Sequence, residues 1–251
     1  MKRGPELDLN SISKREKTEN IPQEQLNKEL LAAVKAGDLQ RVESLLQTGA
    51  NPNHCAYIQR IFIREIINGE LIKIPPDPSA STKSVPLLAI ACAKNYLPIV
   101  KTLIQFGADK KITIESTPAL HYVMRMGQIA LAEVLIESGF DLEETDHDRT
   151  ALHHAIELNN HVLVKKLLEH GANTEALYDG QTALHVAVRR NFVEVVKLLC
   201  ENHANLEALY NEQTPLHSAI QYGIEDSAKI LIDANCNLES IYKNATPLHN
   251  A

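Results

Sequence analysis

The chain has 251 residues, of which 44% are hydrophobic and 23% charged, and this suits a folded protein with a substantial core. Its formal net charge of −7 argues against nucleic acid as a partner, because nucleic-acid-binding surfaces need clustered basic residues. Aromatic residues are only 4% and tryptophan is absent, so the core must consist mainly of Leu, Ile, Val and Ala, which suits helix packed against helix.

The four cysteines, Cys55, Cys92, Cys200 and Cys236, lie far apart and form no C-x-x-C pair. This spacing fits neither a disulfide framework nor a zinc site, so we expect reduced thiols, no metal and no cofactor. No secretory signal follows Met1, and no apolar run is long enough to cross a bilayer. The sequence predicts a cytoplasmic protein without membrane contact, with delivery into a host cell as an open alternative.

The N-terminal segment, residues 1–22, is polar and charged and has no hydrophobic periodicity, so we expect it to be disordered. Short apolar stripes begin after it and recur to the end of the chain. We therefore expect one domain over residues 23–251.

A six-residue motif recurs in this domain. Its copies are Thr150-Ala-Leu-His-His-Ala155, Thr182-Ala-Leu-His-Val-Ala187, Thr214-Pro-Leu-His-Ser-Ala219 and Thr246-Pro-Leu-His-Asn-Ala251. Their leucines are 32 residues apart, backward steps of 32 lead to Leu120 and Leu88, and an earlier copy, out of phase, begins at Leu30. The pattern resembles the ankyrin repeat, whose T-P-L-H-x-A signature opens a two-helix unit. The resemblance implies an all-α repeat solenoid of helix-turn-helix units joined by β-hairpin loops, with six full repeats and the start of a seventh.

Two positions in each repeat predict where its helices end. The residue seven places after the anchor leucine is always Gly or Asn, namely Gly37, Asn95, Gly127, Asn159, Asn191 and Gly223. The residue nineteen places after it is Gly49, Gly107, Gly139, Gly171, His203 or Asn235. All of these residue types tolerate positive φ, so we expect a left-handed residue at each position.

Leu30 and Leu88 are 58 residues apart, 26 more than one repeat of 32, so an insertion at about 54–84 separates the first two repeats. Asn68-Gly69 lies between β-branched runs in the segment 58–74, which is a strong hairpin signal. We predict that the ordinary connecting hairpin is extended here into a two-stranded β-finger. A lone hairpin is only marginally stable, so its apolar face must rest on the solenoid or on a partner.

Three series of side chains repeat along the chain. The histidines, His121, His153, His185, His217 and His249, would lie about 10 Å apart, which is too far to converge on one metal ion, so we assign them to the framework. Glu143, Glu175, Glu207 and Glu239 stand where many ankyrin repeats have an Asn that bonds adjacent hairpins. They are expected to form the same bond, and they are either solvated charges or an acidic stripe that favours a basic partner. Asn53 is the only residue of the usual type at this position.

The third series, Tyr178, Tyr210 and Tyr242, lies near the hairpin tips, where the rings either bind a partner or pack along the next hairpin. Ankyrin partners usually dock on the concave face formed by the hairpins and the first helices, and first-helix residues change type from repeat to repeat. The candidate partner-binding residues are the three tyrosines together with Tyr122, Arg125, Met126, Glu157, Arg189, Arg190, Gln221 and Tyr222.

No catalytic or nucleotide-binding motif occurs in the sequence. We therefore expect a protein–protein interaction scaffold and no enzyme. The alternative is a targeting module of a larger enzyme or host-directed effector whose active domain lies beyond residue 251, because the chain stops early in a seventh repeat. A third hypothesis is a structural oligomer in which the sixth repeat docks on a second copy, and the oligomeric state stays open.

Overall fold

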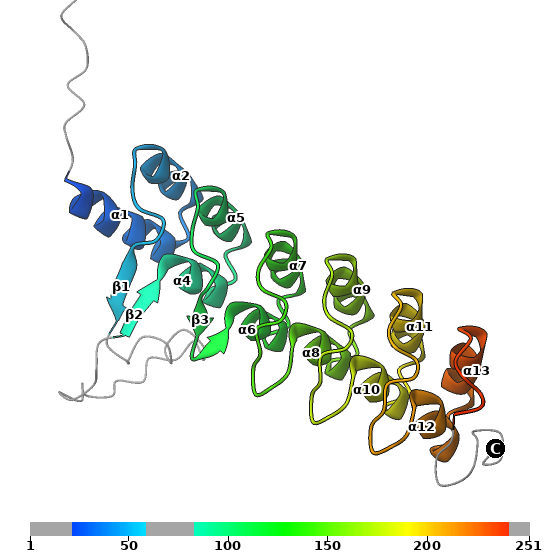
Figure 1. The fold of residues 1–251 in the computed structure, drawn as a ribbon. Helices are drawn as coiled ribbons and strands as arrows, with labels where there is room; N and C mark the ends of the chain where they lie inside the picture. The colour runs from blue at the N-terminus through cyan, green and yellow to red at the C-terminus, as the bar shows by residue number, and fades with distance from the viewer. Residues whose placement is uncertain (1–21, 59–82, 241–251) are drawn as a thin grey trace, which may run out of the picture.

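The structure, a computed structural model, describes residues 22–58 and 83–240, which form a single row of helix pairs (Figure 1). The six pairs are α1 (Gln23–Ala36) with α2 (Leu39–Gln47), α4 (Leu87–Ala93) with α5 (Leu97–Gln105), α6 (Ala119–Arg125) with α7 (Ile129–Glu137), α8 (Ala151–Glu157) with α9 (His161–Glu169), α10 (Ala183–Arg189) with α11 (Val193–Glu201), and α12 (Pro215–Gln221) with α13 (Glu225–Asp233). First helices pack on first helices of neighbouring pairs, and second helices do the same. The predicted helical repeat solenoid is confirmed.

The left-handed residues occur where the sequence predicts them. All six residues that follow the first helices have positive φ, from 49° at Asn159 to 76° at Gly37. All six that follow the second helices do so too, from 61° at His203 to 100° at Gly49. Each such residue turns the chain so that the next amide bonds back into the helix, as Asn160 N does to Ala155 O at 3.0 Å.

The core runs along the whole row without a break. The anchor leucines form its spine, and Leu30, Leu88, Leu120, Leu152, Leu184 and Leu216 are all at most 2% exposed. The small residues Ala91, Ala155, Ala187 and Ala219 are fully buried beside them and let neighbouring first helices approach closely. Because each pair buries its faces against the pairs beside it, stability is shared between nearest neighbours.

The base of the insertion is a two-stranded antiparallel ladder. Strand β1 (Cys55–Ile58) pairs with β2 (Lys83–Pro86), with Cys55 opposite Pro86 and Ile58 opposite Lys83. We expected the second strand of the finger to end at residue 74. The second strand at the base, β2, lies later in the chain, because the chain rejoins the ladder only just before α4. The Asn68-Gly69 turn lies in residues 59–82, outside the described residues.

The later hairpins are much shorter. Strands β3 (Thr113–Ile114) and β4 (Thr117–Pro118) pair in the third repeat. Single bridges close the next three hairpins, at Asp146 and Arg149, Tyr178 and Gln181, and Tyr210 and Gln213. The segment predicted to be disordered, apart from Pro22, and the start of the seventh repeat lie outside the described residues.

Candidate functional site

The glutamate series links each hairpin to the next. The Oε1 atom of Glu143 accepts a hydrogen bond from Asn173 N at 2.8 Å, Glu175 from Asn205 N at 2.9 Å, and Glu207 from Asn237 N at 2.6 Å. Asn53 does the same near the insertion, where its Oδ1 accepts from Asp109 N and its Nδ2 donates to Gly107 O. The predicted bond between adjacent hairpins is therefore confirmed, and among the described residues none of these glutamates has an ion-pair partner.

Replacing Glu175 with alanine should expose the Asn205 amide. We expect its hydrogen exchange to accelerate and the free energy of unfolding to fall by about 1 kcal/mol, because one inter-repeat hydrogen bond is lost. Glu175→Gln keeps an acceptor oxygen in place and should leave the exchange rate near that of the wild type. Equal exchange at Asn205 in both variants, measured by amide hydrogen exchange and NMR, would show that the bond carries no stability.

The histidines at the starts of the first helices belong to the framework. Nδ1 shares a hydrogen bond with the preceding threonine hydroxyl at 2.9 Å for His153, 2.8 Å for His185 and 2.8 Å for His217. Nε2 reaches across to a carbonyl of the following hairpin in two of them, from His121 to Arg149 O at 3.0 Å and from His185 to Gln213 O at 3.3 Å. Among the described residues, no group of three His, Cys, Asp or Glu is arranged to hold a metal ion.

The hairpin tyrosines have one side on this framework and one side in solvent. The Tyr178 ring meets His153 edge-on with centroids 5.9 Å apart, and the Tyr210 ring meets His185 at 6.0 Å. A Cβ on Gly180 would lie 3.6 Å from the Tyr210 ring, so this tyrosine also lies against the preceding hairpin. Both residues stay half-buried, and packing accounts for part of their surface. Tyr242 lies outside the described residues.

Charged and amide groups join the hairpins to the ends of the first helices. Arg149, just before α8, donates to Glu157 at the end of that helix at 2.8 Å and lies 5.7 Å from the centre of the Tyr178 ring. Glu157 also lies 3.7 Å from Arg190 of the next repeat. Sequence reasoning missed Arg149. The sequence does hold a signal for it, because Arg149 with Glu157 and Gln213 with Gln221 are polar pairs at the same two repeat positions. Gln213 donates to Gln221 as Arg149 does to Glu157.

Tyr122 is misassigned by the sequence interpretation. Its side chain is 1% exposed and lies in the core, so it cannot offer the exposed surface that we expected of it. The equivalent residues of the neighbouring repeats, Ile90, His154 and Val186, are also buried, which shows that this position faces inward in the stack. Burial raises the pKa of the Tyr122 hydroxyl, and the Arg125 guanidinium lies 5.7 Å from the centre of its ring.

Exposed hydrophobic side chains accompany the remaining candidates. Leu177 and Leu209, at equivalent positions in successive hairpins, are 60% and 66% exposed. Met126, Leu158 and Tyr222, at equivalent ends of first helices, are 44%, 46% and 55% exposed. We call the combined area the hairpin–helix surface; it comprises Arg125, Met126, Glu157, Leu158, Leu177, Tyr178, Arg189, Arg190, Leu209, Tyr210, Gln221 and Tyr222. Of these, Leu158, Leu177 and Leu209 were not foreseen, because a leucine in a helical repeat is normally a core residue.

A family model described as ankyrin repeats (3 copies) matches residues 30–146, 87–178, 120–210 and 164–242. The chain belongs to the ankyrin-repeat family. A comparison with curated proteins finds no significant match.

Solved ankyrin-repeat structures agree with this assignment. The ankyrin repeat domain of Bcl-3, described as a unique member of the IkappaB protein family, has a TM-score of 0.64 and 25% identity, over 89% of this chain and 93% of that one. An ankyrin repeat domain from Acinetobacter baumannii AYE has a TM-score of 0.59 and 25% identity, over 83% and 98% of the two chains. The human ASB11 ankyrin repeat domain, with a TM-score of 0.54 and 24% identity over 88% and 90%, shares the fold.

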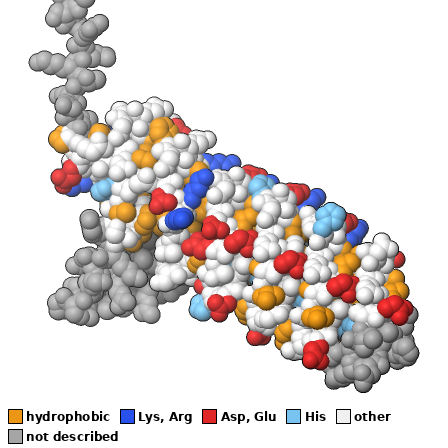
Figure 2. Space-filling view, in the orientation of Figure 1, with side chains coloured by type: hydrophobic (Ala, Val, Ile, Leu, Met, Phe, Trp, Pro, Cys, Tyr) orange, Lys and Arg blue, Asp and Glu red, His pale blue; other side chains and the backbone are white. Residues whose placement is uncertain are grey.

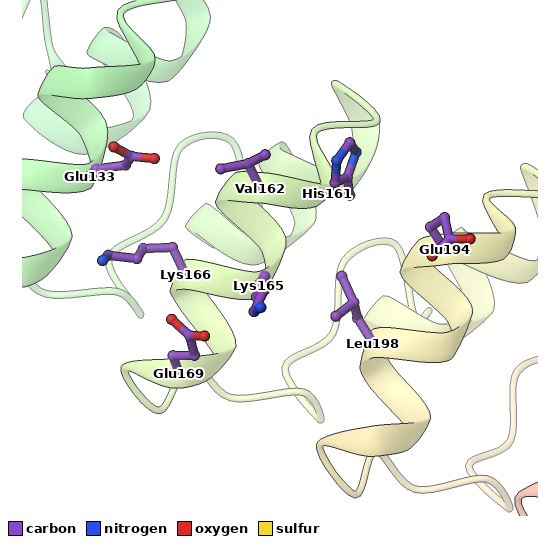
Figure 3. A pocket seen from close by; sticks show the side chains of 8 residues that line it. All are labelled: Glu133, His161, Val162, Lys165, Lys166, Glu169, Glu194 and Leu198. Atoms are coloured by element: carbon purple, nitrogen blue, oxygen red, sulfur yellow. The ribbon is translucent and has the colours of Figure 1, made fainter.

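The opposite side of the ankyrin stack offers a less specific feature. A depression of about 400 Å³ lies over α7, α9 and α11, and Figure 3 shows carboxylates, lysines and aliphatic side chains mixed around it. Lys166, on its wall, is already paired with Glu137. The mixture of charges favours no single ligand. None of the described helices is both long and apolar enough to cross a membrane.

Proposed function

We propose that this chain acts by binding a partner protein through the hairpin–helix surface, on the concave face of the stack, and that it does so without catalysis. Ankyrin repeats are generally protein–protein interaction modules. The observation that carries the proposal is the set of exposed apolar side chains at repeated positions, from Met126 to Tyr222. Exposed apolar groups surrounded by a polar rim are typical of protein-binding surfaces.

The chemical variation along this surface supports the same proposal. The two residues at the ends of successive first helices are Arg125 with Met126, Glu157 with Leu158, Arg189 with Arg190, and Gln221 with Tyr222. These residues are mostly exposed, whereas the leucines, alanines and histidines of the framework are repeated and buried. A fixed scaffold with variable exposed positions is how repeat proteins set specificity.

The two buried cysteines favour binding over thiol chemistry, and the free cysteines support a cytoplasmic location. Burial raises the pKa of the Cys92 thiol to about 12 and that of Cys236 to about 11, the opposite of what a nucleophilic cysteine needs. All four cysteines are unpaired, as in a reducing compartment.

A pair of matched double variants tests the proposed surface. Arg189→Ala/Tyr222→Ala removes exposed groups of the hairpin–helix surface, and Val162→Ala/Lys197→Ala removes exposed groups of the second helices. We expect affinity purification from cytosol with mass spectrometry to show that the first variant loses a specific protein which the wild type and the second variant retain. Tyr178 is a poorer target because its ring also packs on His153. Identical captured proteins for all three chains, with matching circular dichroism, would contradict the proposal.

A further inference from the structure

The hairpins between the third and sixth repeats are strongly acidic. Segments 141–149, 173–181 and 205–213 contain nine acidic residues and one basic residue, Arg149; the acidic residues are Asp141, Glu143, Glu144, Asp146, Asp148, Glu175, Asp179, Glu207 and Glu212. Arg149 is neutralised by Glu157 at 2.8 Å. None of the nine lies within ion-pair distance of a lysine or arginine among the described residues. Asp146 is buried and lies 3.0 Å from His147, and the other eight carboxylates give the hairpins a net negative charge that faces a partner.

The exposed leucines lie within this acidic area. Leu177 is two residues after Glu175 and two before Asp179, and Leu209 is two residues after Glu207. Figure 2 shows acidic side chains following one another across the repeats, with hydrophobic side chains between them. A leucine that is 60% or 66% exposed buries only the smaller part of its apolar surface in the fold, so the larger part stays available for a partner.

We propose that the acidic hairpins bind a lysine- or arginine-rich segment of the partner protein that carries apolar side chains at the spacing of the repeats. This inference rests on the proposed function and names the chemistry of the partner. The basic groups would face the carboxylates around Glu175 and Glu207, and the apolar groups would cover Leu177 and Leu209. Complementary charge speeds association and rejects acidic partners, while the leucines supply the apolar contact that charge alone lacks.

The spacing of the repeats indicates what such a segment looks like. Packed helices stand about 8–10 Å apart, so Leu177 and Leu209 should be separated by a similar step. In an extended chain of the polyproline II type, every third side chain lies on one face, about 9 Å apart. A segment with an apolar residue at every third position between lysines or arginines therefore matches both leucines at once.

Three synthetic peptides test this proposal against the full chain by isothermal titration calorimetry. The probe has five Lys-Lys-Leu units, the second peptide replaces each Leu with Ser, and the third replaces each Lys with Glu. We expect the Lys-Lys-Leu peptide to bind, and the other two to bind about tenfold more weakly or not at all. Raising the salt concentration should weaken the binding of the first peptide because its lysines meet exposed carboxylates.

Matched variants locate the binding site. Leu177→Ser/Leu209→Ser should lower the affinity for the Lys-Lys-Leu peptide about tenfold. The control Val162→Ser/Ile232→Ser removes two exposed apolar groups from the second helices and should leave this affinity unchanged. Glu175→Gln/Glu207→Gln should lower the affinity for the same peptide several-fold, and it keeps an acceptor for the amides of Asn205 and Asn237. The control Glu194→Gln/Glu201→Gln on α11 should leave the affinity unchanged.

Wild-type affinity in the leucine variant, or equal losses in a variant and its control, would overturn the proposal. Its failure is separate from failure of the proposed function. If Arg189→Ala/Tyr222→Ala still loses a specific protein but the three peptides do not differ, the surface binds a partner of other chemistry. If neither experiment gives a difference, both proposals are wrong.

Discussion

Lowering the pH from 7 to 4 is expected to destabilise the repeat stack by several kcal/mol, because its buried histidines must be protonated. The pKa values of His121, His153, His154, His185 and His217 are all lowered, in each case mainly by burial. For His154 the pKa falls from 6.5 to about 4. A pKa that is lower in the folded state means that the unfolded chain binds more protons in this pH range. The stability is therefore complete above pH 6.5 and is lost as the pH falls toward 4.

His154 is expected to dominate this effect. It is 6% exposed, its ring centroid lies 5.7 Å from that of His121, and its Nδ1 has no hydrogen-bond partner among the described residues. Its shift corresponds to about 3 kcal/mol once both folded and unfolded chains are protonated. Protonating both rings would place two cations side by side in a dry site, close to Arg149.

Urea denaturation at pH 7.5 and pH 5 measures this dependence. His154→Val places in this repeat the residue that Val186 supplies one repeat later, so the packing has a precedent in the chain. We expect the variant to lose about 2 kcal/mol less than the wild type between the two pH values. His161→Gln, at an exposed position, is the control and should behave as the wild type. If the His154 variant and the wild type lose the same stability, His154 is not the acid-sensitive group.

Two leucine-to-alanine changes should separate framework from surface. Leu152 is 1% exposed at the centre of the stack, and its replacement should cost about 3 kcal/mol through lost burial and the cavity left behind. Leu177 is 60% exposed, and its replacement should change stability by less than about 0.5 kcal/mol. The two variants remove the same atoms, so the difference reports mainly the burial of the two side chains.

Guanidinium chloride titrations followed by circular dichroism check both values. A broadened or two-step transition for Leu152→Ala would be consistent with weaker coupling between the repeats on its two sides, because each repeat is held by its neighbours. A cost above about 1 kcal/mol for Leu177→Ala would contradict its assignment to the surface, and with it the use of Leu177 in partner binding.

The fold was predictable because a few residue types have strict backbone requirements. Gly, Asn and, in one repeat, His203 at two fixed distances from each anchor leucine identified twelve helix ends, and each has positive φ in the structure. The predicted hairpin bonds of Glu143, Glu175 and Glu207 followed from their repeat position and are present. The helix ends depend on local chain geometry and the hairpin bonds on the constant step between repeats, and both recur with the sequence.

The candidate surface was less predictable because exposure depends on neighbours in space. Tyr122 looked like a variable exposed residue, yet the equivalent Ile90 and Val186 indicate a buried position, and a comparison across repeats would have shown it. Leu177 and Leu209 were not singled out from the sequence, although polar Thr145 at the same position one repeat earlier indicates an exposed site. The strand at Lys83–Pro86 was not predicted, because it follows a Pro- and Ser-containing segment whose length does not fix how the two strands pair.

The stacking of each repeat only on its neighbours also determines how the molecule responds to mechanical force. A load applied between the two ends is carried in series, so the stack would lengthen one repeat at a time and not rupture as a whole. Each released repeat of 32 residues would add roughly 100 Å of slack. A partner seated across Leu177 and Leu209 would clamp two adjacent hairpins together, and the repeats that it holds would be the last to come apart.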